Sequence, residues 1–94
     1  MEPFIYMRDD TIVSRRIGEE FILVPIRRKT EDVESIYTLN EMGAFIWEYL
    51  DGNTSTITIR DAIIETFEVS HEEAENDLVG FLHQLETLGV IQKK

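Results

Sequence analysis

Apolar runs over the first 39 positions predict three β-strands. Residues 11–17 are rich in β-branched side chains, and residues 20–26 contain a continuous apolar run that is typical of a central strand. Gly18 lies between these segments and suits a tight turn, because glycine adopts positive φ without strain. Residues 35–39 are again rich in strand-forming side chains and predict the third strand.

From Asn40 onward the apolar positions recur with the period of an α-helix, about 3.6 residues. Each of three apolar stripes follows a residue whose side chain can cap a helix, namely Asn40, Thr58 or Ser70. The pattern therefore predicts helices over residues 40–51, 58–68 and 71–88.

The stripes of these helices predict the core. Its members are Phe45, Ile46, Leu50, Ile63, Phe67, Leu78, Leu82 and Leu85. Trp47 lies one step off its stripe, which indicates packing in the core or at its boundary.

Short segments are expected to join or flank the helices. Gly52 suits the left-handed position after the first helix, and residues 53–56 then form a polar loop. Residues 1–10 form a leading arm, and residues 90–91 can add a short final strand.

This order of elements predicts an α+β fold. A three-stranded antiparallel sheet followed by three helices makes a winged-helix-like arrangement. All 94 residues belong to one domain, because domains typically contain about 100–150 residues.

The composition excludes several kinds of protein. The chain contains no cysteine, which rules out disulfides, thiolate metal sites and a cysteine nucleophile and fits a reducing cytoplasm. No apolar run approaches the ~18–20 residues that cross a bilayer, and residues 1–10 do not resemble a secretory signal. We therefore expect a cytoplasmic protein.

The charge distribution argues against nucleic acid and membrane surfaces as partners. The net charge is −10, and residues 39–94 hold eleven acidic side chains against three basic ones. Such a surface repels phosphate backbones and anionic headgroups.

No motif supports catalysis. His71 and His83 are twelve positions apart and have no further ligands at metal-binding spacing. The chain contains neither a glycine-rich phosphate loop nor a nucleophile elbow. We expect no catalytic residue, metal or cofactor.

Two stretches resemble the PqqD family, which is named for a protein of pyrroloquinoline quinone biosynthesis. The matching residues are Leu39-Asn40-Glu41, Ile46-Trp47, Leu50-Asp51-Gly52, Asp77, Phe81-Leu82, Leu85, Leu88 and Gly89-Val90-Ile91. The resemblance implies a peptide-recognition module without enzymatic activity. Such a module binds the leader of a ribosomally made precursor peptide and presents it to a modifying enzyme, commonly a radical S-adenosylmethionine enzyme.

The second hairpin departs from the pattern of members dedicated to pyrroloquinoline quinone. Those members tend to carry a tight Pro-Glu-Gly turn, whereas here Pro25 precedes a longer charged loop over residues 27–34. The departure favours a relative that serves another peptide system.

The resemblance also implies where the leader binds, namely along the exposed edge of the third strand and against the third helix. The edge residues are Glu34, Ser35, Ile36, Tyr37 and Thr38. The helical wall consists of Asp77, Phe81, Gln84 and Leu88, whose spacing places them on one side of the helix. The acidic third helix favours a peptide that carries Lys or Arg.

Other interpretations of these residues stay open. Residues 35–39 pair inside a sheet that has no vacant edge, or they form that edge. Asp77 pairs with a cation of the peptide, or it is a solvated residue on an acidic helix face.

Two other functions are compatible with the fold. A winged helix can bind DNA through its third helix, but residues 71–88 hold five acidic side chains and no Lys or Arg. A domain that binds only another protein, without a peptide substrate, is not separated from peptide recognition by the sequence.

Overall fold

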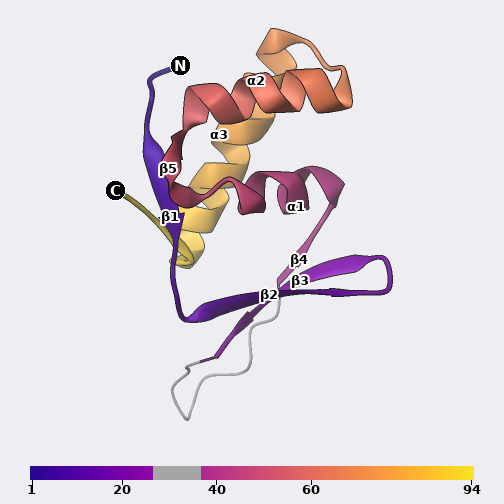
Figure 1. Cartoon of the computed structure of the whole chain (residues 1–94), viewed down its shortest axis with the longest axis vertical. Coiled ribbons are helices and arrows are strands. Elements are labelled where there is room, and N and C mark those ends of the chain that lie inside the picture. Colours follow the sequence, from indigo (N-terminus) through magenta and orange to yellow (C-terminus); the bar gives the residue numbers. More distant parts are fainter. Residues whose placement is uncertain (27–36) are drawn as a thin grey trace.

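The computed structural model describes residues 1–26 and 37–94 of the chain (Figure 1). The elements of this part of the chain are β1 (Ile5–Arg8), β2 (Ile12–Ile17), β3 (Glu20–Pro25), β4 (Tyr37–Leu39), α1 (Glu41–Glu48), β5 (Asp51–Ser55), α2 (Thr56–Phe67), α3 (His71–Leu88) and β6 (Ile91–Lys93). An antiparallel sheet precedes the helices, so the predicted α+β, winged-helix-like fold is confirmed.

The predicted three-stranded sheet has the strand order β2-β3-β4 and is antiparallel. Val13 pairs with Val24 across the first hairpin, and Phe21 pairs with Leu39 on the other side of β3. Gly18 has a φ of 62° in the turn, as its position between the two predicted strands required. The β2–β3 hairpin extends away from the helices, at the end of the molecule opposite α2 (Figure 1).

A second antiparallel sheet with the order β5-β1-β6 was missed in part. The predicted leading arm contains its central strand, and the predicted polar loop over residues 53–56 lies mostly in β5. The proposed short final strand is present as β6. Backbone pairing holds this sheet together, so a polar segment such as β5 joins it without an alternating apolar pattern.

Two of the three predicted helix caps are confirmed. The Asn40 side chain accepts a hydrogen bond of 2.8 Å from the Gly43 amide, and the Ser70 hydroxyl accepts one of 3.0 Å from the Glu73 amide. The cap at Thr58 is wrong, because Ser55 caps α2 and the helix begins at Thr56.

The buried hydroxyl of Thr56 explains the earlier start of α2. It accepts a hydrogen bond of 3.0 Å from the Phe4 amide and donates one of 3.1 Å to the Glu2 carbonyl. These bonds join the start of the helix to the N-terminal segment.

Gly52 does not terminate α1. The helix ends at Glu48 with Tyr49 as its C-cap, and the chain then enters β5. The φ of Gly52 is 81°, and the register between β1 and β5 shifts beside it. The positive φ of Gly52 therefore belongs to the backbone irregularity at which the β1–β5 register shifts.

The core lies where the helices meet both sheets. Six of the eight predicted core residues are buried: Ile46, Leu50, Ile63, Leu78, Leu82 and Leu85. Phe45 and Phe67 are only half-buried, and their rings meet edge to face with 5.3 Å between their centres.

Trp47 is fully buried and belongs to this core. Arg8 of β1 lies beside it, with its guanidinium 5.9 Å from the indole centre and a 2.9 Å hydrogen bond to the Trp47 carbonyl. The second sheet therefore provides the packing for the side of α1 that the apolar stripe did not predict.

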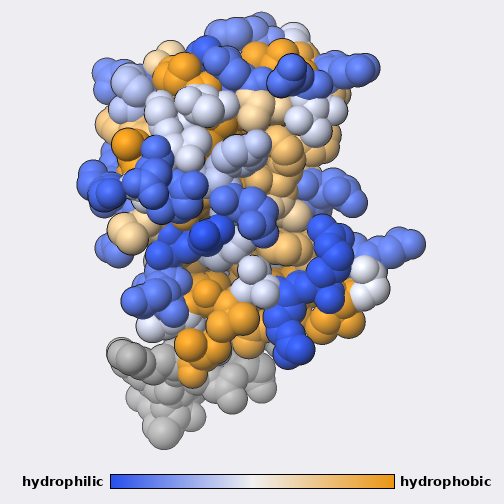
Figure 2. Space-filling model, in the orientation of Figure 1, coloured by the Kyte–Doolittle hydropathy of each residue, from blue (hydrophilic) through white to orange (hydrophobic). Residues whose placement is uncertain are grey.

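Hydrophilic side chains cover much of the face drawn in Figure 2, and apolar ones gather toward the β2–β3–β4 end. The apolar side chains exposed in this region include Val13, Ile17 and Ile26. Within residues 1–26 and 37–94, no helix combines the length and the hydropathy that crossing a membrane requires.

Candidate functional site

A groove runs between strand β4 and helix α3. Its volume is about 330 Å³. It is lined by Tyr37, Thr38, Leu39, Asn40, Phe81, Gln84, Leu85 and Leu88. One wall is therefore a strand with its following cap residue, and the other is a helix face.

Strand β4 is an edge of its sheet within the described part of the chain. It pairs with β3 through Leu39, Thr38 and Tyr37, and no other described strand lies along its second side. An edge strand presents backbone amides and carbonyls to which another extended chain can add. Of the two open interpretations of this segment, the geometry favours the vacant edge.

The groove continues across α3 toward the start of α1. The adjoining hollow has a volume of about 490 Å³. It is lined by Asn40, Met42, Gly43, Asn76, Asp77, Gly80, Phe81 and Gln84. Because the two hollows share Asn40, Phe81 and Gln84, they form one continuous surface, which we call the α3 groove.

The centre of the α3 groove depends on close packing between α1 and α3. A β-carbon at Gly43 would lie only 3.0 Å from Cε1 of Phe81 and 3.2 Å from Oδ1 of Asn40. The absence of a side chain at Gly43 therefore lets the Phe81 ring lie against the first turn of α1 while Asn40 caps that turn.

All the predicted site residues that the structure describes line this groove. Tyr37 and Thr38 come from β4, and the four wall residues come from α3. Leu88 lies at the β4 end, Asp77 lies at the α1 end, and Phe81 and Gln84 lie between them. Glu34, Ser35 and Ile36 lie outside the described residues.

The contribution of α1 to the groove was not predicted from the sequence. Asn40 was interpreted only as a helix cap and Gly43 was given no role. Both lie within residues 39–52, the first stretch that resembles the PqqD family, and that stretch was the available signal. Their proximity to Phe81 could not be inferred from helix periodicity, because periodicity does not specify how two helices pack.

The electrostatic character of α3 is acidic. The helix carries Glu72, Glu73, Glu75, Asp77 and Glu86, and it contains no Lys or Arg. Arg60 of α2 lies near its start, but its guanidinium is shared between Glu75 and Asp61 at 3.1 Å and 3.0 Å. The hydrogen bond to Asp61, followed by that to Glu75, raises the pKa of Arg60.

Asp77 is the acidic residue of α3 that lines the groove. Its side chain is exposed and forms no ion pair with the described residues. None of the described lining residues is Lys or Arg. The groove thus suits a ligand that brings its own cation.

The described residues contain no cluster of three or more His, Asp or Glu side chains that could hold a metal ion. His71 and His83 are both exposed. His71 lies 3.9 Å from Glu75 on the next turn of α3.

In the comparison with known families, the model of coenzyme PQQ synthesis protein D (PqqD) matches residues 20–91. The chain belongs to the PqqD family. The match includes β3, β4 and all three helices, and therefore the whole described part of the α3 groove. A comparison with curated proteins found no match.

A solved structure described as TbiB1 in complex with the TbiA(beta) leader peptide is similar over most of both chains. The TM-score is 0.75 and the sequence identity is 26%, with 92% of this chain and 94% of that chain covered.

Proposed function

We propose that this PqqD-family protein binds the leader of a ribosomally made precursor peptide in the α3 groove. The leader adds as a strand beside β4 and lays its side chains against Phe81, Gln84 and Leu88. The protein presents the bound precursor to a modifying enzyme, of the radical S-adenosylmethionine type, and carries out no chemistry itself.

The observation that carries this proposal is the meeting of an edge strand with an open helix face in one groove. Backbone groups of β4 supply affinity that does not depend on the sequence of the peptide. The side chains of α3 supply selectivity, because alternate residues of an added strand point toward that helix. The similar TbiB1 structure contains a leader peptide, which supports the same class of ligand.

The edge proposed from the sequence continues from Tyr37 back through Glu34, Ser35 and Ile36. These three residues remain part of the proposed site. The proposal does not depend on them, because Tyr37, Thr38 and the α3 wall already define a binding surface.

The test is a binding titration with the precursor peptide encoded beside this protein. We expect Phe81→Ala to weaken leader binding about tenfold or more, because the ring lies at the centre of the groove and large aromatic side chains dominate such interfaces. Isothermal titration calorimetry gives the Kd, and amide chemical-shift mapping gives the location.

Phe67→Ala is the matched control. Phe67 of α2 is also a half-buried aromatic residue, but it packs against Phe45 of α1 and does not line the groove. We expect it to lower thermal stability and to leave leader affinity within about twofold of the wild type. Shifts confined to the β2–β3 hairpin or to α2, with Tyr37, Thr38 and α3 silent, would refute the proposed site.

A further inference from the structure

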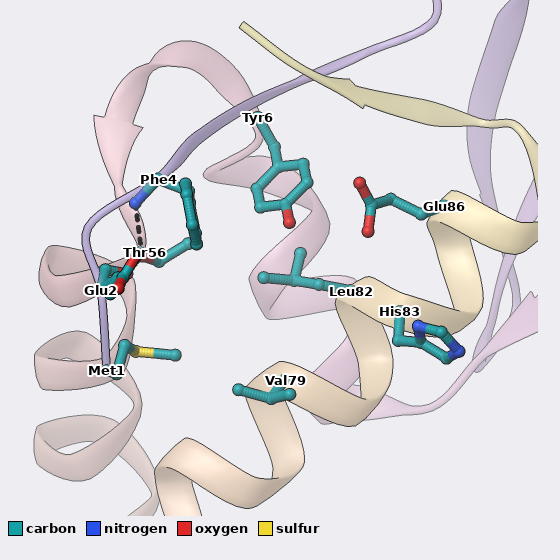
Figure 3. A pocket seen from close by; sticks show the side chains of 9 residues that line it. All are labelled: Met1, Glu2, Phe4, Tyr6, Thr56, Val79, Leu82, His83 and Glu86. Atoms are coloured by element: carbon teal, nitrogen blue, oxygen red, sulfur yellow. Dashed lines mark hydrogen bonds between the residues drawn. The ribbon is translucent and has the colours of Figure 1, made fainter.

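A second cleft lies on the other side of α3, between this helix and the N-terminal segment (Figure 3). Its volume is about 220 Å³. It is lined by Met1, Glu2, Phe4, Tyr6, Thr56, Val79, Leu82, His83 and Glu86. The interior is mostly apolar, with Val79 54% exposed and Phe4 39% exposed at its margin.

Hydrogen bonds and ring contacts hold the N-terminal wall of this cleft in place. The Thr56 hydroxyl accepts a hydrogen bond from the Phe4 amide and donates one to the Glu2 carbonyl. The Lys93 ammonium lies 4.1 Å from the centre of the Phe4 ring. Contacts with α2 and β6 therefore hold the N-terminal wall in position.

The polar groups of the cleft are arranged to receive a cation. Figure 3 shows the Tyr6 hydroxyl and the Glu86 carboxylate turned toward the same space. Burial first, and then the nearby Glu86 charge, raise the pKa of Tyr6. Glu86 forms no ion pair with the described residues. The described lining contains no Lys or Arg, and the Met1 ammonium that belongs to it lies 3.7 Å from Glu75.

The cleft and the α3 groove lie on opposite sides of one helix. At ~100° per residue, Asp77, Phe81, Gln84 and Leu88 cluster around one direction of α3. Val79, Leu82, His83 and Glu86 cluster about 180° away. A protein bound in the cleft would therefore leave the groove free for the peptide.

We propose that this cleft is the docking site for the modifying enzyme that receives the bound precursor. The enzyme inserts one bulky apolar side chain into the cleft and places a neighbouring Lys or Arg against Glu86. This inference rests on the proposed function, because an adaptor that presents a peptide must hold peptide and enzyme at the same time.

The size and the charge of the cleft favour this occupant. A cavity of ~150 Å³ is enough for benzene, so the cleft accommodates a Leu or Phe side chain. The acidic rim disfavours an acidic partner surface, including a second copy of this chain with its net charge of −10. A partner that offers one protruding apolar side chain with Lys or Arg beside it matches both the size of the cleft and the acidic charge of its rim.

The experiment measures two affinities for each variant. The probes are the purified modifying enzyme encoded beside the precursor, and the precursor leader itself. The variants are Val79→Glu, which places a charge in the apolar cleft, and Glu86→Lys, which reverses the charge of its rim. Ile17→Glu is the control, because Ile17 is 58% exposed on β2 and lies outside the cleft.

We expect Val79→Glu and Glu86→Lys each to weaken enzyme binding about tenfold or more, and Ile17→Glu to change it less than about twofold. Leader affinity stays within about twofold in Val79→Glu and Ile17→Glu. Enzyme affinity is the same for the free protein and for the protein saturated with leader. Circular dichroism melts confirm that each variant is folded.

The inference is overturned if the wild type does not bind the enzyme, if both cleft variants bind it normally, or if the leader competes with it. A loss of leader affinity in Val79→Glu would assign the cleft to the peptide instead. A wild-type dimer that Val79→Glu dissociates would assign it to a second copy. Failure of the wild type to bind the leader refutes the proposed function itself, and is thus distinguishable from failure of the docking site alone.

Discussion

Single residues decide the shape of the α3 groove, and Gly43 shows this most directly. The Phe81 ring occupies the space that a side chain at Gly43 would need. The same first turn of α1 is capped by Asn40, which also lines the groove. Packing, capping and the candidate binding surface therefore depend on the same few atoms.

We predict that Gly43→Ala weakens leader binding several-fold, because the new methyl group displaces the Phe81 ring. Gly80→Ala is the matched control, since Gly80 lines the same groove but a β-carbon there meets no atom within 4 Å. An alanine at Gly80 should raise stability by about 0.5–1 kcal/mol through helix propensity. Calorimetric titration and thermal melts measure both effects. Equal leader affinity in the two variants would contradict this account of the groove.

A pH-dependent contribution to stability is expected from Asp51 at the start of β5. Its carboxylate accepts hydrogen bonds from the Asn53 amide at 2.9 Å and the Thr54 hydroxyl at 3.1 Å. The first of these is the main cause that lowers the pKa of Asp51. A lowered pKa means that the stabilisation is present above the unfolded value of about 3.9 and is lost as the pH falls through the folded value.

Asp51→Asn should therefore destabilise the protein at neutral pH and differ less from the wild type as the medium becomes acidic. Urea unfolding of both proteins at pH 7 and near pH 3 measures the difference in free energy. A difference that stays constant over this range would show that the carboxylate charge is not involved.

At the scale of elements, α3 serves three surfaces at once. Ala74, Leu78, Leu82 and Leu85 face the core, and all four are buried. The α3 groove and the second cleft lie on the two flanks of this buried stripe. A substitution on α3 therefore affects stability if the side chain faces the core, and binding if the side chain lies on either flank.

We predict that Leu78→Ala lowers the free energy of unfolding by about 2–5 kcal/mol, because Leu78 is fully buried and the change leaves a cavity. Val79→Ala at the next position should change it by less than about 0.5 kcal/mol, since this side chain is largely exposed. Denaturant unfolding measures both. Similar losses would mean that the buried stripe is assigned to the wrong face.

The N-terminal segment is a structural element of the fold. The Arg8 amide donates to the Leu50 carbonyl at 3.0 Å, and the Asp9 amide donates to the Val90 carbonyl at 2.9 Å. We predict that both amides exchange slowly with deuterium, with protection comparable to the amides in the middle of α3. Fast exchange at Arg8 and Asp9 would show that this segment is not held by the β5-β1-β6 sheet.

For the molecule as a whole, we expect net charge to influence which peptides the proposed site binds. The net charge is −10, and α3 contributes acidic side chains without any basic one. Long-range attraction therefore favours a leader that carries Lys or Arg near Asp77.

We predict that leader affinity falls several-fold between 0.1 and 1 M salt, as the screening length shortens from about 10 Å to about 3 Å. Asp77→Asn should flatten this salt dependence, because the removed charge lies in the groove. Glu65→Gln removes an exposed charge on α2, outside the groove, and should flatten it less. Titrations at several salt concentrations give the slopes. Identical slopes for the two variants would contradict a specific role for Asp77.

The sequence by itself determined the features that depend on residues close together in the chain. The caps at Asn40 and Ser70 are local hydrogen bonds. The grouping of Asp77, Phe81, Gln84 and Leu88 on one side of α3 follows from helix geometry. For the same reason six of the eight predicted core residues on the helix stripes are buried, and the order of the predicted strands and helices was correct. Such features need no knowledge of distant segments.

Only the tertiary structure decided the features that depend on segments far apart in the chain. The sheet β5-β1-β6 joins Ile5 to Ser55 and Tyr6 to Lys93 through backbone hydrogen bonds, which leave no periodic side-chain pattern. Contacts with this N-terminal region also explain why α2 starts at Thr56, earlier than predicted, and why Trp47 is buried. The contact of Gly43 with Phe81 and the cleft behind α3 are likewise products of packing, because the relative placement of two elements is set by contacts that neither element encodes alone.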